Sequence, residues 1–237
     1  MADRYYIDMD LGPGEFELTG PEAHHLAVVC RVRQGEEVFL FNGRGEQYLA
    51  RVLQAAKRSV ILNIETIEKP VREIGYRLEV AVALPKGDRA DFLVEKLTEL
   101  GVTRLIPLQT ARSVVHPRDT KIERLQRQVI EASKQCGRNW LMEIGEMVRW
   151  TDFITSSDLP YLKLLSHPGE SLHDVSNSNS GDVVVAIGPE GGFAEEEVAK
   201  ACEAGWQKVS LGPRILRIET AAIVMATRFN SQLTPNF

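Results

Sequence analysis

The sequence has few cysteines and no long apolar run. Its three cysteines, Cys30, Cys136 and Cys202, are far apart and form no C-x-x-C motif. This pattern argues against a disulfide framework and a structural zinc site, and it is typical of a reducing compartment. No apolar run approaches the roughly 18–20 residues that a membrane span needs, and the N-terminal residues resemble no signal peptide. We therefore expect a cytoplasmic protein that is not in the membrane and has no metal site.

The chain also lacks an overall excess of positive charge. Its 237 residues include 28 Lys+Arg and 33 Asp+Glu, giving a net charge of −5. Because cations drive phosphate binding, this balance speaks mildly against a nucleic-acid partner. The stretch from Arg104 to Arg138 is an exception, with eight basic and three acidic residues. Such a local excess is either a phosphate-contacting surface or the solvated face of a helix.

Residues 1–70 have the pattern of a small β-barrel. Three segments, 37–41, 47–53 and 59–64, read as short strands, and a short helix is expected over 21–29. The Asn-Gly-Arg-Gly sequence between the first two strands predicts a hairpin turn, because glycine accepts positive φ. Many short strands in so few residues favour a barrel.

From residue 71 onward the pattern is that of an α/β domain, in which strands alternate with helices. The run 183–187 is apolar on both faces, as in a buried parallel strand. Asp88 is expected to cap the first helix and Gly101 to end it. We expect strands over 77–84, 103–108, 162–165, 183–187 and 208–211, and helices over 88–100, 121–136, 194–204 and 220–232.

A glycine-rich loop, residues 188–193 (GPEGGF), follows the buried strand and precedes a helix. Proteins of the α/β class bind ligands at this end of the sheet, although such a loop is often only a tight turn. Its spacing matches neither the dinucleotide fingerprint nor the P-loop, which disfavours a nicotinamide enzyme. Glu195, Glu196 and Glu197 in the first helical turn would repel a phosphate. A cationic or neutral ligand is favoured, and a sulfonium is compatible.

A second loop, residues 211–221 (LGPRILRIETA), places two arginines and a glutamate among aliphatic residues. The closely spaced aliphatic side chains indicate partial burial, and buried charges need partners. One interpretation is an internal ion pair between Glu219 and either Arg214 or Arg217. The other is an apolar slot for a flat ring, with a guanidinium facing a substrate.

Together the two loops resemble the bacterial RsmE family, the ribosomal RNA small-subunit methyltransferases that make N3-methyluridine in 16S rRNA and belong to the SPOUT superfamily. The two loops and four further motifs match the family in the same order along nearly the whole chain. Six ordered matches are far more specific than one glycine-rich loop. Ala194 departs from the family, because relatives often place a helix-capping hydroxyl residue there; losing such a cap typically costs about 0.5–2 kcal/mol. The other four motifs are His24–Leu26 with Arg31 and Gly35, Lys86–Arg89 with Glu95–Gly101, Arg112–Val115, and Glu131–Arg138.

The resemblance implies a PUA-like β-barrel RNA-binding domain over residues 1–70 and an α/β, SPOUT-type methyltransferase domain over 71–237. It also implies a C-terminal trefoil knot, which periodicity does not indicate and which general topology rules count against. The expected cofactor is S-adenosyl-L-methionine, the expected partner is 16S rRNA or the small ribosomal subunit, and the chain is expected to form a homodimer.

In the reaction that the resemblance implies, uracil N3 loses its proton and attacks the cofactor's methyl group. The site must align the two, stabilise the uracil anion and exclude water. Arg217 is expected to stabilise the developing charge, because a guanidinium has fixed planar donors and stays charged. Glu219 is the nearest carboxylate, as a catalytic group or by orienting Arg217. The residues expected to hold the cofactor are Leu165, Gly188, Pro189, Glu190, Gly191, Leu211, Gly212, Ile215, Leu216 and Thr220.

RNA contacts are expected from the barrel and from the basic stretch. Arginine contacts phosphate in bidentate fashion, whereas the two neighbouring histidines could equally be a packed helix start. The target uridine must be unpaired or flipped, since a base pair hides its N3 edge. The candidate RNA-binding residues are His24, His25, Arg31, Lys86, Arg112, Lys134 and Arg138.

Two rival functions remain open. One is a SPOUT enzyme that methylates the ribose 2′-oxygen, and the other is an RNA-binding or ribosome-assembly protein without catalysis. Enzymes of the first kind usually carry Asn and Ser before the last helix, where this chain has residues 217–221 (RIETA). That difference favours methylation of the base.

Overall fold

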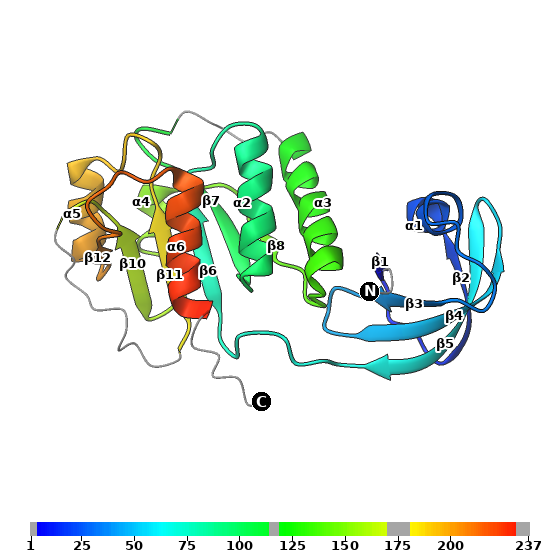
Figure 1. Cartoon of the computed structure of the whole chain (residues 1–237). Helices are drawn as coiled ribbons and strands as arrows, with labels where there is room; N and C mark the ends of the chain where they lie inside the picture. Colours follow the sequence, from blue (N-terminus) through cyan, green and yellow to red (C-terminus); the bar gives the residue numbers. More distant parts are fainter. Residues whose placement is uncertain (1–3, 114–118, 170–180, 231–237) are drawn as a thin grey trace. The chain divides into compact units, whose positions relative to one another are not determined.

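The chain forms two compact units in a computed structural model that describes residues 4–113, 119–169 and 181–230. The first unit comprises Met1–Arg72 and Ser133–Leu141, and the second comprises Glu73–Ala132 and Met142–Phe237 (Figure 1). The predicted division at residue 70 treats both domains as continuous and stays a prediction. The compact units differ from it mainly in the placement of Ser133–Leu141.

The first unit is built on a five-stranded sheet in the order β1-β3-β4-β5-β2. Its pairings are antiparallel except for β1 with β3. In strand β5 the alternate residues Val60, Leu62 and Ile64 are buried, which explains the period-two pattern in the sequence. The strands are β1 (Arg4–Tyr6), β2 (Gly14–Thr19), β3 (Glu37–Phe41), β4 (Gln47–Ala55) and β5 (Ser59–Glu68).

The helix predicted over 21–29 is present but divided. An α-helical turn, α1 (Gly20–His24), passes directly into a π-helical turn, η1 (His25–Val29). The amide of Cys30 donates to the carbonyl of His25, which is the i→i+5 bond of a π-helix. Arg31 follows with a φ of 55°, in the left-handed region.

The second unit is a parallel sheet covered by helices, as predicted for an α/β domain. The strand order is β12-β10-β11-β6-β7-β8, and the short β9 pairs with β7. The central strands β6 and β11 are buried along their whole length, which accounts for the uninterrupted apolar sequence of β11; in β6 the buried Glu79 interrupts the apolar run. The strands are β6 (Leu78–Val82), β7 (Arg104–Gln109), β8 (Glu143–Ile144), β9 (Val148–Arg149), β10 (Leu162–Ser166), β11 (Val183–Ile187) and β12 (Gln207–Val209).

The helices of this unit are close to the predicted positions. The last helix packs against α2 and against strands β6 and β11, and Figure 1 shows these two helices on the same face of the sheet. The prediction that Asp88 caps α2 is wrong, because the cap position is Gly87 with a φ of 62° and Asp88 is already helical. The helices are α2 (Asp88–Glu99), α3 (Asp119–Cys136), α4 (Trp150–Phe153), α5 (Glu195–Glu203) and α6 (Ile218–Asn230).

Candidate functional site

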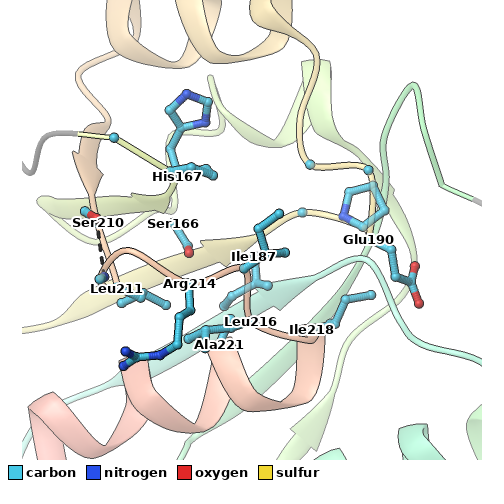
Figure 2. A pocket seen from close by; sticks show the side chains of 18 of the residues that line it. Ser166, His167, Ile187, Glu190, Ser210, Leu211, Arg214, Leu216, Ile218 and Ala221 are labelled. Carbon is cyan, nitrogen blue, oxygen red and sulfur yellow. Dashed lines mark hydrogen bonds between the residues drawn. The ribbon is translucent and has the colours of Figure 1, made fainter.

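Three loops meet where strands β10, β11 and β12 end. The three strands are neighbours and parallel, so their carboxyl ends lie at the same edge of the sheet. The loops Ser166–Gly169, Gly188–Gly192 and Ser210–Leu216 line a cavity of about 610 Å³. Pockets for small ligands are commonly about 300–1,000 Å³. We call this space the large cavity, and Figure 2 shows the side chains around it.

The two loops singled out in the sequence therefore share one cavity. Eight of the ten residues predicted to hold a cofactor line it: Gly188, Pro189, Glu190, Gly191, Leu211, Gly212, Ile215 and Leu216. Leu165 is not among the lining residues because its side chain is fully buried in the hydrophobic core. Thr220 is exposed on α6 and does not line the cavity either. The binding role of all ten residues stays a prediction.

The sequence did not reveal the third loop. Ser166, His167, Pro168 and Gly169 line the large cavity, yet they carry neither a glycine motif nor a charge pattern. Burial lowers the pKa of His167 below its ordinary value of 6.5, and the nearby cation of Lys208 lowers it further. The imidazole is therefore neutral at pH 7 and adds no positive charge to the cavity wall.

The glycine-rich loop folds back on itself. The amide of Gly192 donates to the carbonyl of Pro189 at 2.8 Å, and Gly192 has a φ of 68°, which favours glycine. A Cβ on Gly188 would lie 2.9 Å from the ring of Phe193, so that glycine is needed for space. The Phe193 ring is buried, with its centroid 4.5 Å from that of Trp150.

Two arginine side chains contact the glycine-rich loop. Arg89 Nη2 lies 3.0 Å from Glu190 Oε1, and Arg112 Nη1 donates to the carbonyl oxygen of Gly191 at 2.6 Å. Arg112 was predicted to contact RNA, and its guanidinium instead lies against the loop in this structure. Its predicted contact with RNA stays a prediction.

Glu219 is buried, with its side chain 9% exposed, and its ion-pair partner is Arg89 at 3.7 Å. No ion pair joins it to Arg214 or Arg217 in the described part of the chain, so the proposed internal pair within the second loop is absent there. Arg217 is exposed. Neither Arg217 nor Glu219 lines the large cavity.

The second loop is only partly buried. Ile218 is buried and Leu216 is intermediate, whereas Ile215 is 91% exposed. Gly212 has a φ of 103° and no atom near the place of a Cβ, so its conformation and not the available space favours glycine.

Glu197 stabilises the start of helix α5. Its carboxylate accepts hydrogen bonds from the amides of Ala194 and Ala111, both at 2.8 Å. Ala194 has no hydroxyl to cap the helix, and the buried carboxylate three residues later bonds to its backbone instead. The bond to Ala111 also ties the glycine-rich loop's helix to the segment after β7.

A smaller cavity of about 280 Å³ adjoins the first. The two cavities share Pro189 and Glu190 as lining residues. Lys86, one of the candidate RNA-binding residues, also lines the smaller cavity and is exposed. Its full lining is Ala83, Leu84, Pro85, Lys86, Ser113, Pro189 and Glu190.

The other candidate RNA-binding residues belong to the first unit. His24 and Arg31 are exposed, and His25 packs edge-on against Tyr5. Lys134 is only 10% exposed and pairs with Glu22 at 3.0 Å. Arg138 is buried. The structure thus gives Lys134 and Arg138 packed positions, and their contacts with RNA stay predictions.

Within 4–113, 119–169 and 181–230, no group of three or more His, Cys, Asp or Glu side chains is placed to hold a metal ion. None of the helices in those ranges has the length and apolar character to cross a membrane.

Comparison with known families gives matches over most of the chain. Residues 72–230 match the family described as RNA methyltransferase domain, and residues 18–65 match the RNA methyltransferase PUA domain. Ribosomal RNA small subunit methyltransferase E from Rickettsia conorii is 32% identical over 93% of this chain and 92% of its own length. The Synechocystis protein of the same name is 32% identical over 91% of this chain and 73% of its own length.

Two solved structures are similar over nearly the whole fold. Ribosomal RNA small subunit methyltransferase E from Neisseria gonorrhoeae, bound to S-adenosyl methionine, has a TM-score of 0.90 at 30% identity. A methyltransferase from Legionella pneumophila in complex with the bound cofactor SAM has a TM-score of 0.89 at 33% identity. Each comparison covers 98% of both chains.

Proposed function

Since this chain belongs to the RNA methyltransferase family that contains ribosomal RNA small subunit methyltransferase E, we propose that it transfers a methyl group from S-adenosyl-L-methionine to N3 of a uridine in 16S rRNA. Relatives of that name are similar over nine-tenths of this chain. The SPOUT-type fold follows from the structural likeness to the same family. The trefoil knot stays a prediction.

The observation that carries the proposal is the large cavity at the ends of three neighbouring parallel strands. Its volume of about 610 Å³ suits a nucleoside-sized ligand. Its wall combines glycine backbone, which lets a ligand approach the main chain, with aliphatic side chains that can sandwich a flat ring. Two similar structures with bound cofactor agree with this use of the fold.

The charges around the large cavity fit a cationic ligand better than a phosphate. Glu190 lines it, Glu197 lies at the start of the following helix, and His167 is neutral at pH 7. Arg214 is the one arginine among its lining residues. When bound, S-adenosyl-L-methionine supplies an electrophilic methyl group on a positively charged sulfur.

We propose that the residues of the chain hold and align the reactants in the following way. The loops Gly188–Gly192 and Ser210–Leu216 hold the adenosine through backbone groups and aliphatic faces. The neutral wall at His167 avoids repelling the sulfonium. Arg217, which is exposed at the start of α6, is proposed to meet the negative charge that develops on the uracil oxygens. Glu219 forms an ion pair with Arg89 and so helps to position the arginine that contacts Glu190.

The oligomeric state and the RNA contacts are proposals as well. Relatives with the printed name act on ribosomal RNA of the small subunit, and the PUA-domain match supports an RNA-contacting role for the first unit. We propose a cytoplasmic homodimer that acts on 16S rRNA or the assembled subunit, and light scattering of the purified protein measures its mass directly.

The test is methylation of small ribosomal subunits from a strain that lacks the modification. We expect mass spectrometry of digested 16S rRNA to detect N3-methyluridine after incubation with the protein and S-adenosyl-L-methionine. A methyl group on a ribose 2′-oxygen would instead support the rival enzyme class. A protein that releases no heat on titration with the cofactor would support a binding protein without catalysis.

A further inference from the structure

The smaller cavity has no role in the function proposed so far. We propose that it receives the pyrimidine ring of the target nucleotide and that Glu190 accepts the proton from N3. This inference rests on the proposed function and specifies where the methyl acceptor lies. Its support comes from the position of the cavity, the chemistry of its wall and the contacts of Glu190.

The position is right for a methyl acceptor. Reacting atoms must approach to about 3–3.5 Å in a productive complex, so the acceptor ring needs a space that borders the cofactor's. The large and smaller cavities share Pro189 and Glu190. Figure 2 shows the Glu190 side chain on the far side of the large cavity from Ser210 and Arg214.

The wall of the smaller cavity suits a flat base. The segment 83–85 (ALP), which follows strand β6, is buried and apolar, and Pro189 is also buried. These groups can cover the faces of a ring. The volume of the smaller cavity, about 280 Å³, is less than half that of the large cavity. A space of this size suits a single pyrimidine base better than the whole cofactor.

The polar groups match the hydrogen-bonding edge of uracil. That edge presents an N–H between two carbonyl oxygens, and the wall offers one carboxylate, Glu190, and one ammonium group, Lys86. The carboxylate accepts from N3–H, and the ammonium group donates to a carbonyl oxygen and stabilises its negative charge. Cytosine has a lone pair at N3, which the Glu190 carboxylate would repel.

Contacts around Glu190 hold its carboxylate in place. Arg89 Nη2 contacts Oε1 at 3.0 Å, and Arg89 is itself held by the buried Glu219. No hydrogen bond to Oε2 of Glu190 occurs among the described residues, so this oxygen is available for the N3 proton. The side chain is 51% exposed, which lets the proton pass to water afterwards.

The step balances. The N3–H bond breaks and its proton goes to Glu190. The electron pair left on N3 forms a bond to the methyl carbon, and the sulfur–methyl bond breaks with its electron pair going to sulfur. N3-methyluridine and S-adenosylhomocysteine are the products, and Glu190 returns its proton to solvent.

The first experiment compares Glu190→Gln with a matched control, Glu196→Gln, which removes one carboxylate from the exposed face of α5. Single-turnover methylation of small subunits is measured from pH 6 to pH 10. General-base catalysis commonly contributes about 10²–10⁴-fold, so we expect E190Q to be slowed by about 100-fold or more at pH 7. The deficit should shrink as pH rises, because N3 then loses its proton without help.

Calorimetry with S-adenosyl-L-methionine accompanies the rates. Because Glu190 also lines the large cavity, we expect E190Q to bind the cofactor more weakly by up to about fivefold, and the rates are therefore compared at saturating cofactor. A deficit that stays constant over the whole pH range, or a rate within tenfold at pH 7, would overturn the role of Glu190 as the base. Complete loss of cofactor binding would overturn it too, because the carboxylate would then be needed to hold the cofactor and not to take the proton.

A second experiment locates the ring without relying on activity. Small subunits with 4-thiouridine at the target position are irradiated with the protein and S-adenosylhomocysteine. We expect crosslinks to residues 83–86, and crosslinks confined to 211–216, which line the large cavity, would overturn the assignment of the smaller cavity. If the unmodified protein makes no N3-methyluridine, the proposed function fails; if it does and these tests fail, only the present inference fails.

Discussion

Arg89 contacts two carboxylates that are far from it in the sequence. Glu190 lies 3.0 Å away in the glycine-rich loop, and Glu219 lies 3.7 Å away at the start of α6. The pair with the exposed Glu190 contributes little to stability by itself. Glu219 is different, because a buried carboxylate without a partner carries its desolvation cost uncompensated.

We therefore expect Arg89→Ala to lower the free energy of unfolding by about 1–3 kcal/mol. Replacing Glu219 with Gln in the same chain should restore part of that loss, since the charge that needed Arg89 is gone. Urea unfolding of the two single variants and the double variant measures the coupling. Arg127→Ala, at an exposed position of α3, is the control. Strictly additive effects would show that the two side chains do not interact.

We expect His167 to make cofactor binding depend on pH. Burial and Lys208 lower the pKa of this histidine below 6.5, so the imidazole is neutral at pH 7 and gains a proton as the pH falls through the lowered value. An imidazolium would repel a sulfonium in the same cavity. Unit charges about 4 Å apart in water repel by roughly 1 kcal/mol, or about fivefold in affinity.

We expect the affinity for S-adenosyl-L-methionine to fall a few-fold in the unmodified protein as the pH drops from 7 through the lowered pKa of His167. In a His167→Gln variant the affinity should stay constant over the same range. Calorimetric titrations at four pH values make the comparison. An equal decline in both proteins would assign the pH dependence to another group.

At the scale of elements, the start of α5 offers a stabilising change. Ala194 has the backbone conformation of a cap, with φ −69° and ψ 153°, and no side-chain acceptor. A serine hydroxyl there can accept from the amide of Glu197 while the Glu197 carboxylate keeps its bond to residue 194. Ala194→Ser should raise the free energy of unfolding by about 0.5–1 kcal/mol.

The control is Ala199→Ser, which makes the same change at an exposed position inside the same helix. Serine has a lower helix propensity than alanine, so this variant should lose a few tenths of a kcal/mol. Thermal unfolding at fixed pH compares them. Equal changes in the free energy of unfolding of the two variants would mean that serine at the cap position gains no hydrogen bond.

The longer elements could mostly be predicted from the sequence, although the six-residue strand β2 was missed; of the very short strands, only β12 was predicted. Strands β3, β4 and β5 alternate buried and exposed residues, and α2 has an apolar stripe, so both appear where expected. Strand β1 has three residues and β8 and β9 have two each, too few to show a period. These short strands form only by pairing with β3 or β7, which are far from them in the sequence.

The candidate site was predictable where glycine signalled an unusual backbone, as in residues 188–192 and at Gly212. The loop Ser166–Gly169 has no such signal, and only the strand order places it beside the others. The partners of Arg89, Glu190 and Glu219, lie 101 and 130 residues further along the chain, so no local spacing reveals them. Lys134 was predicted to contact RNA, whereas in the structure its ammonium group pairs with Glu22 of the first unit, a partner more than a hundred residues earlier in the chain.

The molecule as a whole has a net charge of −5, yet its family acts on RNA. Its two units each have their own sheet, and the large cavity is lined entirely by the second unit. Cofactor binding should therefore order a small, defined part of the chain. A ligand that binds only the native fold also stabilises it, by a free energy that rises with the logarithm of the ligand concentration.

Hydrogen–deuterium exchange of the full chain, with and without saturating S-adenosyl-L-methionine, tests the cofactor cavity most directly. We expect slower exchange of backbone amides in the three loops at 166–169, 188–192 and 210–216, and unchanged exchange in strands β3, β4 and β5. Protection that avoids these loops, or no protection at saturating cofactor, would contradict the assignment of the large cavity as the place where the methyl donor binds.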